Sequence, residues 1–174
     1  MLSLRLLILA VAAAAAPAAF ADGWNRGPDV APVTNALYQQ ECASCHMAYQ
    51  PGLLPARSWQ RLMGDLADHF GDNAELAPDD QTAITTFLTT HAADRAPEKR
   101  ARKIAASLRS GDTPLRITDT PYIKSKHREL PARLVTGNPR VKSLAQCNAC
   151  HTRAEHGSYS ESQIDIPGYG RWED

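Results

Sequence analysis

Hydrophobic residues recur at helical spacing along residues 58–71, and a histidine shares their face. Ser58 stands at the expected N-cap of this stretch and Gly71 at its expected end. At about 100° per residue, one arc of about 120° holds the apolar side chains and the histidine. The members of this arc are Trp59, Leu62, Met63, Leu66, His69 and Phe70. The pattern predicts an amphipathic helix over 58–71 that directs His69 inward.

Two further helices are predicted over 77–94 and 97–111. In the first, acidic residues occupy the first turn, and one face carries apolar residues followed by His91 at position i+7. In the second, Pro97 and Gly111 mark the expected ends, and the side opposite the apolar face is strongly basic. Such a charge run is typical of a solvated face or of a surface that docks a partner.

The rest of the chain favours short elements joined by irregular connections. Pro121 can begin a helix that ends before Pro131, with His127 on its apolar side. Residues 111–121 are typical of a loop, and residues 157–174 of an extended polar tail. The pattern therefore predicts a mainly α-helical fold of short helices and Pro-rich loops, with little strand.

The first residues follow the pattern of a secretory signal peptide. Residues 1–21 contain one positive charge at Arg5, an apolar run, and a small-x-small cleavage site that ends at Ala21. An uncleaved anchor is the alternative, but Pro17 interrupts the run, which is shorter than the roughly 20 residues that span a bilayer. We expect cleavage, export to the periplasm, and no membrane span in the mature chain.

The composition limits the kind of partner and of core. The 174-residue chain has 19 basic and 19 acidic residues, and removal of Arg5 with the signal peptide leaves a small negative excess. This balance gives no reason to expect a nucleic acid partner. Aromatic residues make up only 6% of the chain, so the core needs another source of apolar surface. A large apolar cofactor would provide it.

All four cysteines lie in two copies of a Cys-x-x-Cys-His motif. The copies are Cys42, Cys45 and His46, and Cys147, Cys150 and His151. Two disulfides would suit an exported protein but would not explain the repeated histidine. Zinc sites usually place their two cysteine pairs about 15 to 20 residues apart, whereas these pairs are about 100 residues apart. Covalent haem explains every residue, because thiols at i and i+3 share one face of a helical turn and the histidine can ligate the iron. The motifs predict two c-type haems.

The function then depends on the sixth ligand of each iron. An open position permits gas binding or peroxide chemistry, whereas two protein ligands favour electron transfer. Beyond the motifs, the candidates are His69, His91, His127, His156, Met47 and Met63. We predict His69 for the first haem and His127 for the second, because both lie on apolar faces at nearly equal separations from His46 and His151. The alternative for an inward histidine is a core residue bonded to a backbone carbonyl.

The other candidates are less favoured for local reasons. Met63 shares the arc of His69 and remains an alternative ligand. His91 also remains an alternative, although the helix dipole by itself favours a histidine at a helix C-terminus. Met47 directly follows His46 and so starts on the proximal side of its haem. His156, five residues after His151, would reach the opposite face of a haem only under strain, and a surface position near a helix end is favoured instead.

Several stretches together resemble the periplasmic dihaem cytochromes c often called DHC. These stretches are CASCHMAYQPGLLPARSW, LADHFGDNAEL, LRITDTPYIKSKHREL and SLAQCNACHTRAEHGSYSESQIDIP. The resemblance spans Cys42 to about Pro167. It implies a mostly helical, two-lobed protein with two low-potential bis-histidine haems, and it carries His69 and His127 over as distal ligands. It further implies a membrane b-type cytochrome as electron donor and a small monohaem, oxygen-binding cytochrome as acceptor.

We therefore expect a monomeric electron carrier and not an enzyme. The expected lobes are residues 22–95 and 96–174, each wrapped on one haem. The alternative is a peroxidase-like or gas-binding haem protein with one open iron. Partners are expected to dock through charge, with the basic segment formed by Lys124, Lys126 and Arg128 as a candidate surface.

Overall fold

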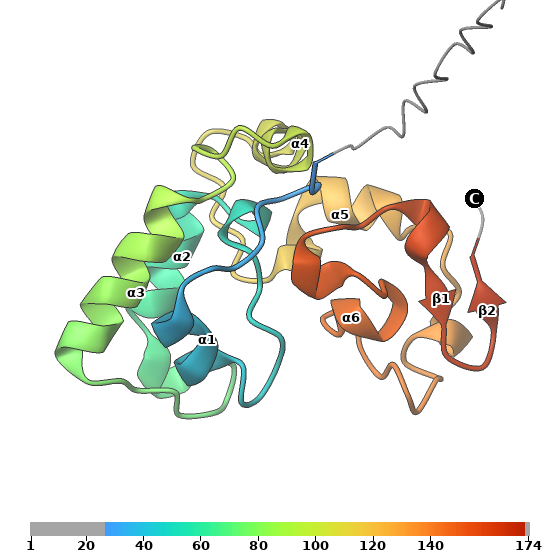
Figure 1. Cartoon of the computed structure of the whole chain (residues 1–174), viewed down its shortest axis with the longest axis horizontal. Helices are drawn as coiled ribbons and strands as arrows, with labels where there is room; N and C mark the ends of the chain where they lie inside the picture. Colours follow the sequence, from blue (N-terminus) through green and yellow to red (C-terminus); the bar gives the residue numbers. More distant parts are fainter. Residues whose placement is uncertain (1–26, 173–174) are drawn as a thin grey trace, which may run out of the picture.

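The computed structural model describes residues 27–172, and the expected signal peptide lies outside them. Two lobes lie side by side, with α1, α2 and α3 in one and α5, α6 and a small β-hairpin in the other (Figure 1). Short helices and irregular connections dominate both lobes, which confirms the predicted mainly α-helical fold. Of the helices in residues 27–172, none combines the length and the apolar character that crossing a membrane would require.

The N-terminal lobe is built on the packing of two helices. Its elements are α1 (Ala36–Cys42), the 3-10 turn η1 (Pro51–Leu53), α2 (Ala56–Met63), the 3-10 turn η2 (Leu66–Asp68) and α3 (Pro78–Thr90). Helix α3 confirms the helix expected over 77–94. Its buried residues Ile84 and Leu88 pack with Trp59 of α2 in one apolar cluster. This packing holds the lobe together beside the first Cys-x-x-Cys-His motif.

The rest of the chain forms shorter elements. They are α4 (Lys99–Ser107), η3 (Ile117–Asp119), α5 (Pro121–Lys126), η4 (Ala132–Leu134), α6 (Cys147–Cys150), η5 (Ala154–His156), η6 (Glu161–Gln163), β1 (Asp165–Ile166) and β2 (Gly170–Arg171). Strands β1 and β2 pair antiparallel. Helix α4 confirms the helix expected over 97–111, although it is shorter, and α5 begins at Pro121 as expected.

The prediction of one helix over 58–71 is wrong. Helix α2 begins after Pro55, so Ser58 is a buried residue within the helix and not its N-cap. The helix ends at Gly64, which lacks the side chain that would favour helix continuation. A turn then follows in which the backbone N–H of Gly71 bonds the Asp68 carboxylate at 3.0 Å. His69 is therefore presented from a turn and not from a helix.

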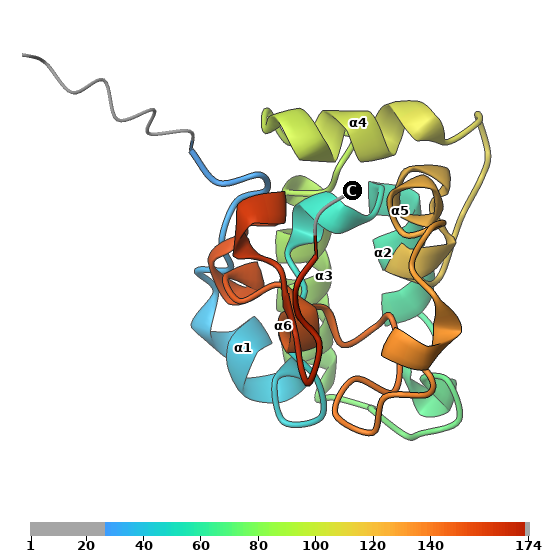
Figure 2. The same cartoon turned by 90° about the vertical axis from the view of Figure 1, so that its right-hand side faces the viewer.

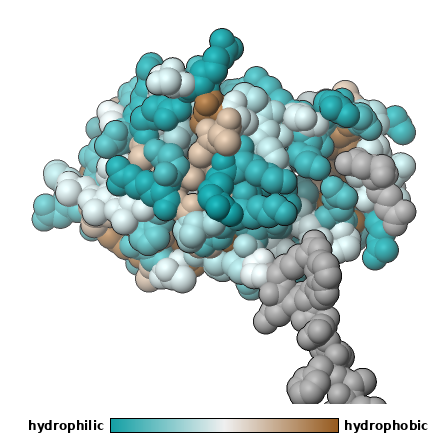
Figure 3. Space-filling model, turned by 90° about the horizontal axis from the view of Figure 1, so that it is seen from above, coloured by the Kyte–Doolittle hydropathy of each residue, from teal (hydrophilic) through white to brown (hydrophobic). Residues whose placement is uncertain are grey.

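A second apolar cluster joins the lobes beneath α4. It contains Val30, Leu53, Ala93, Ala101 and Ile104, all fully or almost fully buried. Helix α4 lies across one end of both lobes (Figures 1 and 2), and the outer surface on that side of the molecule is largely hydrophilic (Figure 3). Contacts therefore cross the boundary expected between residues 95 and 96, and the division into two haem lobes at that point remains a prediction.

Candidate functional site

The first Cys-x-x-Cys-His motif begins at the C-terminus of α1 and opens into a cavity of about 370 Å³. Cys42, Cys45 and His46 all line this cavity, and so does His69 from the turn after η2. The imidazole centroids of His46 and His69 are 6.3 Å apart, with their planes inclined by 30°. The cavity wall is mostly apolar. It includes Leu54, Trp59, Leu62, Met63 and Leu66.

The second motif forms helix α6 and lines a larger cavity, of about 750 Å³. Cys147, Cys150 and His151 reach it from α6 and the residue that follows, and His127 reaches it from the C-terminus of α5. The centroids of His127 and His151 are 6.1 Å apart, and their ring planes are inclined by 78°. Apolar residues from several elements complete the wall. Among them are Leu53, Ile123, Leu130, Val135, Val141 and Ile166.

The separation within each histidine pair suits one metal ion. An imidazole nitrogen binds a metal at about 2 Å and lies roughly 1 Å from the centre of its ring, so two rings on opposite sides of one ion have centroids roughly 6 Å apart. Both pairs meet this distance. Both cavities also have the size and the apolar lining typical of a cofactor site. The described residues therefore fit a planar metal-containing cofactor in each cavity.

Backbone carbonyls fix one ring of each pair. Nδ1 of His46 bonds the carbonyl of Met47 at 2.7 Å, and Nδ1 of His127 bonds the carbonyl of Ile123 at 2.9 Å. Because a carbonyl only accepts, Nδ1 carries the proton in both rings, and Nε2 keeps its lone pair for a metal. His69 and His151 each have a buried Nδ1 that has no hydrogen-bond partner among the described residues.

Burial shifts the pKa values of histidines and cysteines at both sites in the direction that cofactor binding requires. Desolvation lowers the pKa of His69, with a further contribution from His46. It lowers the pKa of His151 to about 4, assisted by His127 and Arg100. Both imidazoles are therefore neutral near pH 7, which is the form that binds iron. Burial also raises the pKa of Cys42 and Cys147 to about 11, so these sites favour uncharged sulfur, as in a thioether.

All four cysteines lie within the described residues, and none forms a disulfide. The structure also separates the alternative ligands. His91 is exposed, lines neither cavity, and bonds the carbonyl of Phe87 in its own helix through Nδ1 at 2.9 Å. His156, in η5, also lines neither cavity. Met63 is 5% exposed and lines the first cavity together with His69, so it remains an alternative ligand.

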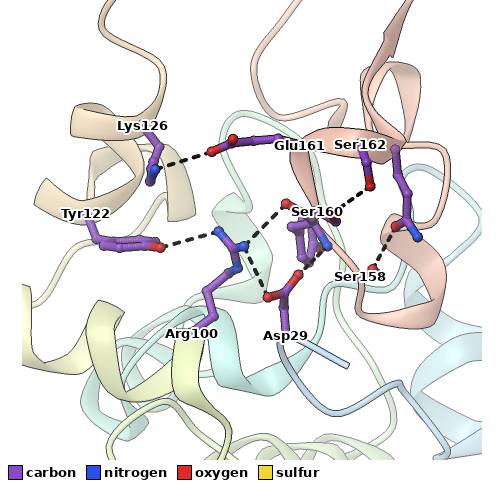
Figure 4. Close-up of polar contacts among 10 residues, drawn as sticks. Asp29, Arg100, Tyr122, Lys126, Ser158, Ser160, Glu161 and Ser162 are labelled. Atoms are coloured by element: carbon purple, nitrogen blue, oxygen red, sulfur yellow. Dashed lines mark hydrogen bonds and ion pairs between the residues drawn. The ribbon is translucent and has the colours of Figure 1, made fainter. Parts of the chain in front are cut away.

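Polar residues gather at one side of the second cavity (Figure 4). The guanidinium of Arg100 pairs with Asp29 at 3.1 Å and donates to the hydroxyl of Tyr122 at 3.3 Å. Lys126 pairs with Glu161 at 3.6 Å across the same region. Arg100 belongs to the basic run for which the sequence left two interpretations, a solvated face or a docking surface. The structure instead shows Arg100 half-buried against the N-terminal segment, where it pairs with Asp29. No pattern in the sequence connects it with Asp29.

Two tyrosines contact the proximal histidines. The ring of Tyr49 stacks on His46 with centroids 4.8 Å apart, and the ring of Tyr159 meets His151 edge-on at 5.3 Å. Neither tyrosine stands out in the sequence. Tyr49 follows soon after the first motif, and this position could have indicated a residue near His46. The contact of Tyr159 with His151 depends on tertiary packing.

The chain is similar to known two-haem proteins. A family model described as dihaem cytochrome c matches residues 38–159. The structure is similar to that of a diheme cytochrome type c from Shewanella baltica OS155, with 41% identity and a TM-score of 0.67 over 80% of this chain and 98% of that chain. It is also similar to a diheme cytochrome c from Rhodobacter sphaeroides, with 42% identity and a TM-score of 0.66 over 75% of this chain and 100% of that chain. No match was found among curated proteins.

Proposed function

Because the chain belongs to the dihaem cytochrome c family, and therefore carries two c-type haems and is an electron-transfer protein, we propose that it acts as a low-potential carrier between two other redox proteins. The donor is a membrane b-type cytochrome that oxidises quinol, and the acceptor is a small soluble haem protein. Family membership confirms the resemblance and the two haems inferred from the sequence motifs. Cytochromes c are typically exported, which supports the periplasm as the compartment.

The two facing histidine pairs are the observation that carries this proposal. Cys42 and Cys45 would attach the first haem, and Cys147 and Cys150 would attach the second. His46 and His69 would hold the first iron, and His151 and His127 would hold the second.

A protein ligand on both sides of each iron suits electron transfer. Each bound haem supplies a one-electron couple. The carbonyls of Met47 and Ile123 hold His46 and His127 in one orientation, so these rings need little rearrangement when the charge of the site changes. Imidazole in place of methionine as the second ligand also favours a lower potential.

The two cavities meet, which supports transfer between the haems. They share five lining residues, which are Ile117, Thr118, Ser143, Gln146 and Cys147. Cys147 belongs to the second motif yet also lines the first cavity, so the attachment point of one haem adjoins the site of the other. Two haems held in these cavities would be neighbours, which would favour transfer of an electron between them.

Carbon monoxide binding tests the proposal against its alternative. The carrier should have only low-spin iron when oxidised, and its reduced form should not bind carbon monoxide at either site. A peroxidase-like or gas-binding protein has at least one open iron, and no observation on residues 27–172 favours it. Carbon monoxide binding by the unmutated, reduced protein, or peroxide turnover, would overturn the carrier function.

A further inference from the structure

Tyr49 and Gln50 connect the two lobes directly behind both proximal histidines. They lie between the first Cys-x-x-Cys-His motif and η1, and both side chains form hydrogen bonds with the C-terminal part of the chain. Each side chain leads to a different proximal histidine. Two consecutive residues therefore contact the surroundings of both haem sites.

Tyr49 acts on the first site. Its ring stacks on that of His46, with the planes inclined by 24°. Its phenol donates a 2.7 Å hydrogen bond to the carbonyl of Ala145, just before the second motif. Its backbone carbonyl accepts a 2.9 Å hydrogen bond from the hydroxyl of the buried Tyr38. Because both ends of Tyr49 are held, its ring adds to the hydrogen bond between His46 and the Met47 carbonyl in limiting the rotation of the stacked imidazole.

Gln50 acts on the second site. It is fully buried, and its Oε1 accepts a 2.6 Å hydrogen bond from the hydroxyl of Tyr159, whose ring meets His151 edge-on at an angle of 66°. Its Nε2 donates to the carbonyl of Ala154 at 2.7 Å. The backbone N–H of Ala154 in turn donates to the carbonyl of His151 at 3.0 Å. Gln50 thus supports His151 both through the ring of Tyr159 and through the backbone.

From these contacts we propose that Tyr49 and Gln50 are positioning residues that set the ring planes of His46 and His151, and through them the electronic state of each iron. This inference rests on the axial ligation proposed above. The overlap between an imidazole and the iron d orbitals depends on the orientation of the ring. A rotated ring therefore changes both the largest g value of low-spin ferric iron and its reduction potential.

Low-temperature electron paramagnetic resonance of the oxidised holoprotein tests the proposal, with haem measured per chain. Each signal is assigned to its site through His69→Ala or His127→Ala. Tyr49→Leu removes the stack and should shift the largest g value of the first signal only. Tyr159→Phe keeps the ring but removes its bond to Gln50, and should shift the second signal only.

Two further variants provide the comparison. Tyr49→Phe keeps the stack and loses only the bond to Ala145, so it should shift the first signal less than Tyr49→Leu does. Tyr169→Phe, at a tyrosine that is 52% exposed, should leave both signals unchanged. If Tyr49→Leu does not assemble with two haems, Tyr49→Phe and Tyr159→Phe decide the question through their site-specific shifts.

The proposal is overturned if the signals of these variants stay at their parental positions, or if every variant moves both signals equally. Failure of the axial ligation gives a different result, because the unmutated protein would then lack two low-spin signals. The two failures can therefore be told apart.

Discussion

The two facing histidine pairs differ in ring orientation although their centroid separations are nearly equal. The planes of His46 and His69 are inclined by 30°, whereas those of His127 and His151 are inclined by 78°. Nearly parallel imidazoles act mainly on one of the two iron d orbitals that can overlap with them, and nearly perpendicular imidazoles act on both. The two irons should therefore differ in electronic structure while sharing the same kind of ligand.

This difference predicts two distinct low-spin signals in the paramagnetic resonance spectrum of the oxidised protein. The signal of the second iron should have the larger maximum g value, because perpendicular rings leave its two d orbitals closer in energy. Comparison of the unmutated protein with His127→Ala identifies that signal, since the variant should lose it. Two equivalent signals, or loss of the signal with the smaller maximum g value, would contradict the prediction.

Single substitutions also test the distal ligands. His69→Ala and His127→Ala should each convert one of the two irons to high spin, and the reduced variants should bind one carbon monoxide per chain. His91→Ala is the matched control, because His91 lies at a helix end but lines neither cavity. The absorption spectrum of the reduced protein under carbon monoxide measures the result. The assignment fails if His91→Ala alone opens a site.

At the scale of elements, the first described segment lies against the turn after η5. The backbone N–H of Val30 donates to the carbonyl of Gly157 at 3.1 Å, and Asp29 accepts from the backbone N–H of Tyr159 at 2.7 Å. Gly157 has φ +72°, and a Cβ atom built there would clash with the backbone carbonyl oxygen of Val30. The position therefore requires glycine both for its backbone conformation and for the close approach of the segments around Val30 and Gly157.

Gly157→Ala should destabilise the protein more than a change at a glycine with similar backbone conformation but open surroundings. Gly111 has φ +91° and nothing within 4 Å of a built Cβ atom, so Gly111→Ala should cost only the left-handed strain of about 1–2 kcal/mol. Gly157→Ala adds the backbone clash, and its cost should be larger by at least about 1 kcal/mol. Denaturant unfolding of the two holoprotein variants measures this difference. Equal losses would show that the close approach to Val30 contributes nothing.

At the scale of the whole molecule, ion pairs reduce the charge of the segment that was the candidate for docking. Lys124, Lys126 and Arg128 each pair with a carboxylate, at 3.1, 3.6 and 3.0 Å respectively. By contrast, three exposed basic residues of α4 have no ion pair within the part of the chain that the structure describes. They are Lys99, Arg102 and Lys103. The largely hydrophilic face over α4 is therefore the better candidate for a partner with negative charge.

Electron transfer to a small acceptor cytochrome with a negatively charged surface should slow as ionic strength rises from about 0.01 to 0.15 M, where the screening length falls from about 30 to 8 Å. Neutralising Lys99 and Arg102 should weaken this salt dependence more than neutralising Lys124 and Arg128, whose charges are paired. Stopped-flow oxidation of the reduced protein measures both effects. Rates that do not respond to salt, or a stronger effect of the paired residues, would contradict docking through α4.

The sequence by itself determined the cofactors, the fold class and the set of histidines that are candidate ligands. Each Cys-x-x-Cys-His motif is local, because its three functional side chains lie within five residues, so their spacing already specifies haem attachment. The apolar arc around Trp59 also predicted an inward His69, and His69 lines the first cavity although no continuous helix extends to it, whereas Phe70 of the same arc is 45% exposed. Burial of apolar side chains turns the same side of the segment toward the core, whether the segment is one helix or a helix followed by a turn.

Only the tertiary structure decided which groups meet across the molecule. The break at Gly64 has a local cause in the low helix propensity of glycine, but the apolar pattern continues past it and does not reveal the turn that presents His69. Gln50 bonds Tyr159 over 109 positions of the chain, and Asp29 bonds Tyr159 over 130. A hydrophobic pattern reports which face of an element is buried but not what covers it. The ring angles of the histidine pairs depend on contacts between residues far apart in the sequence. The sequence pattern therefore could not predict them.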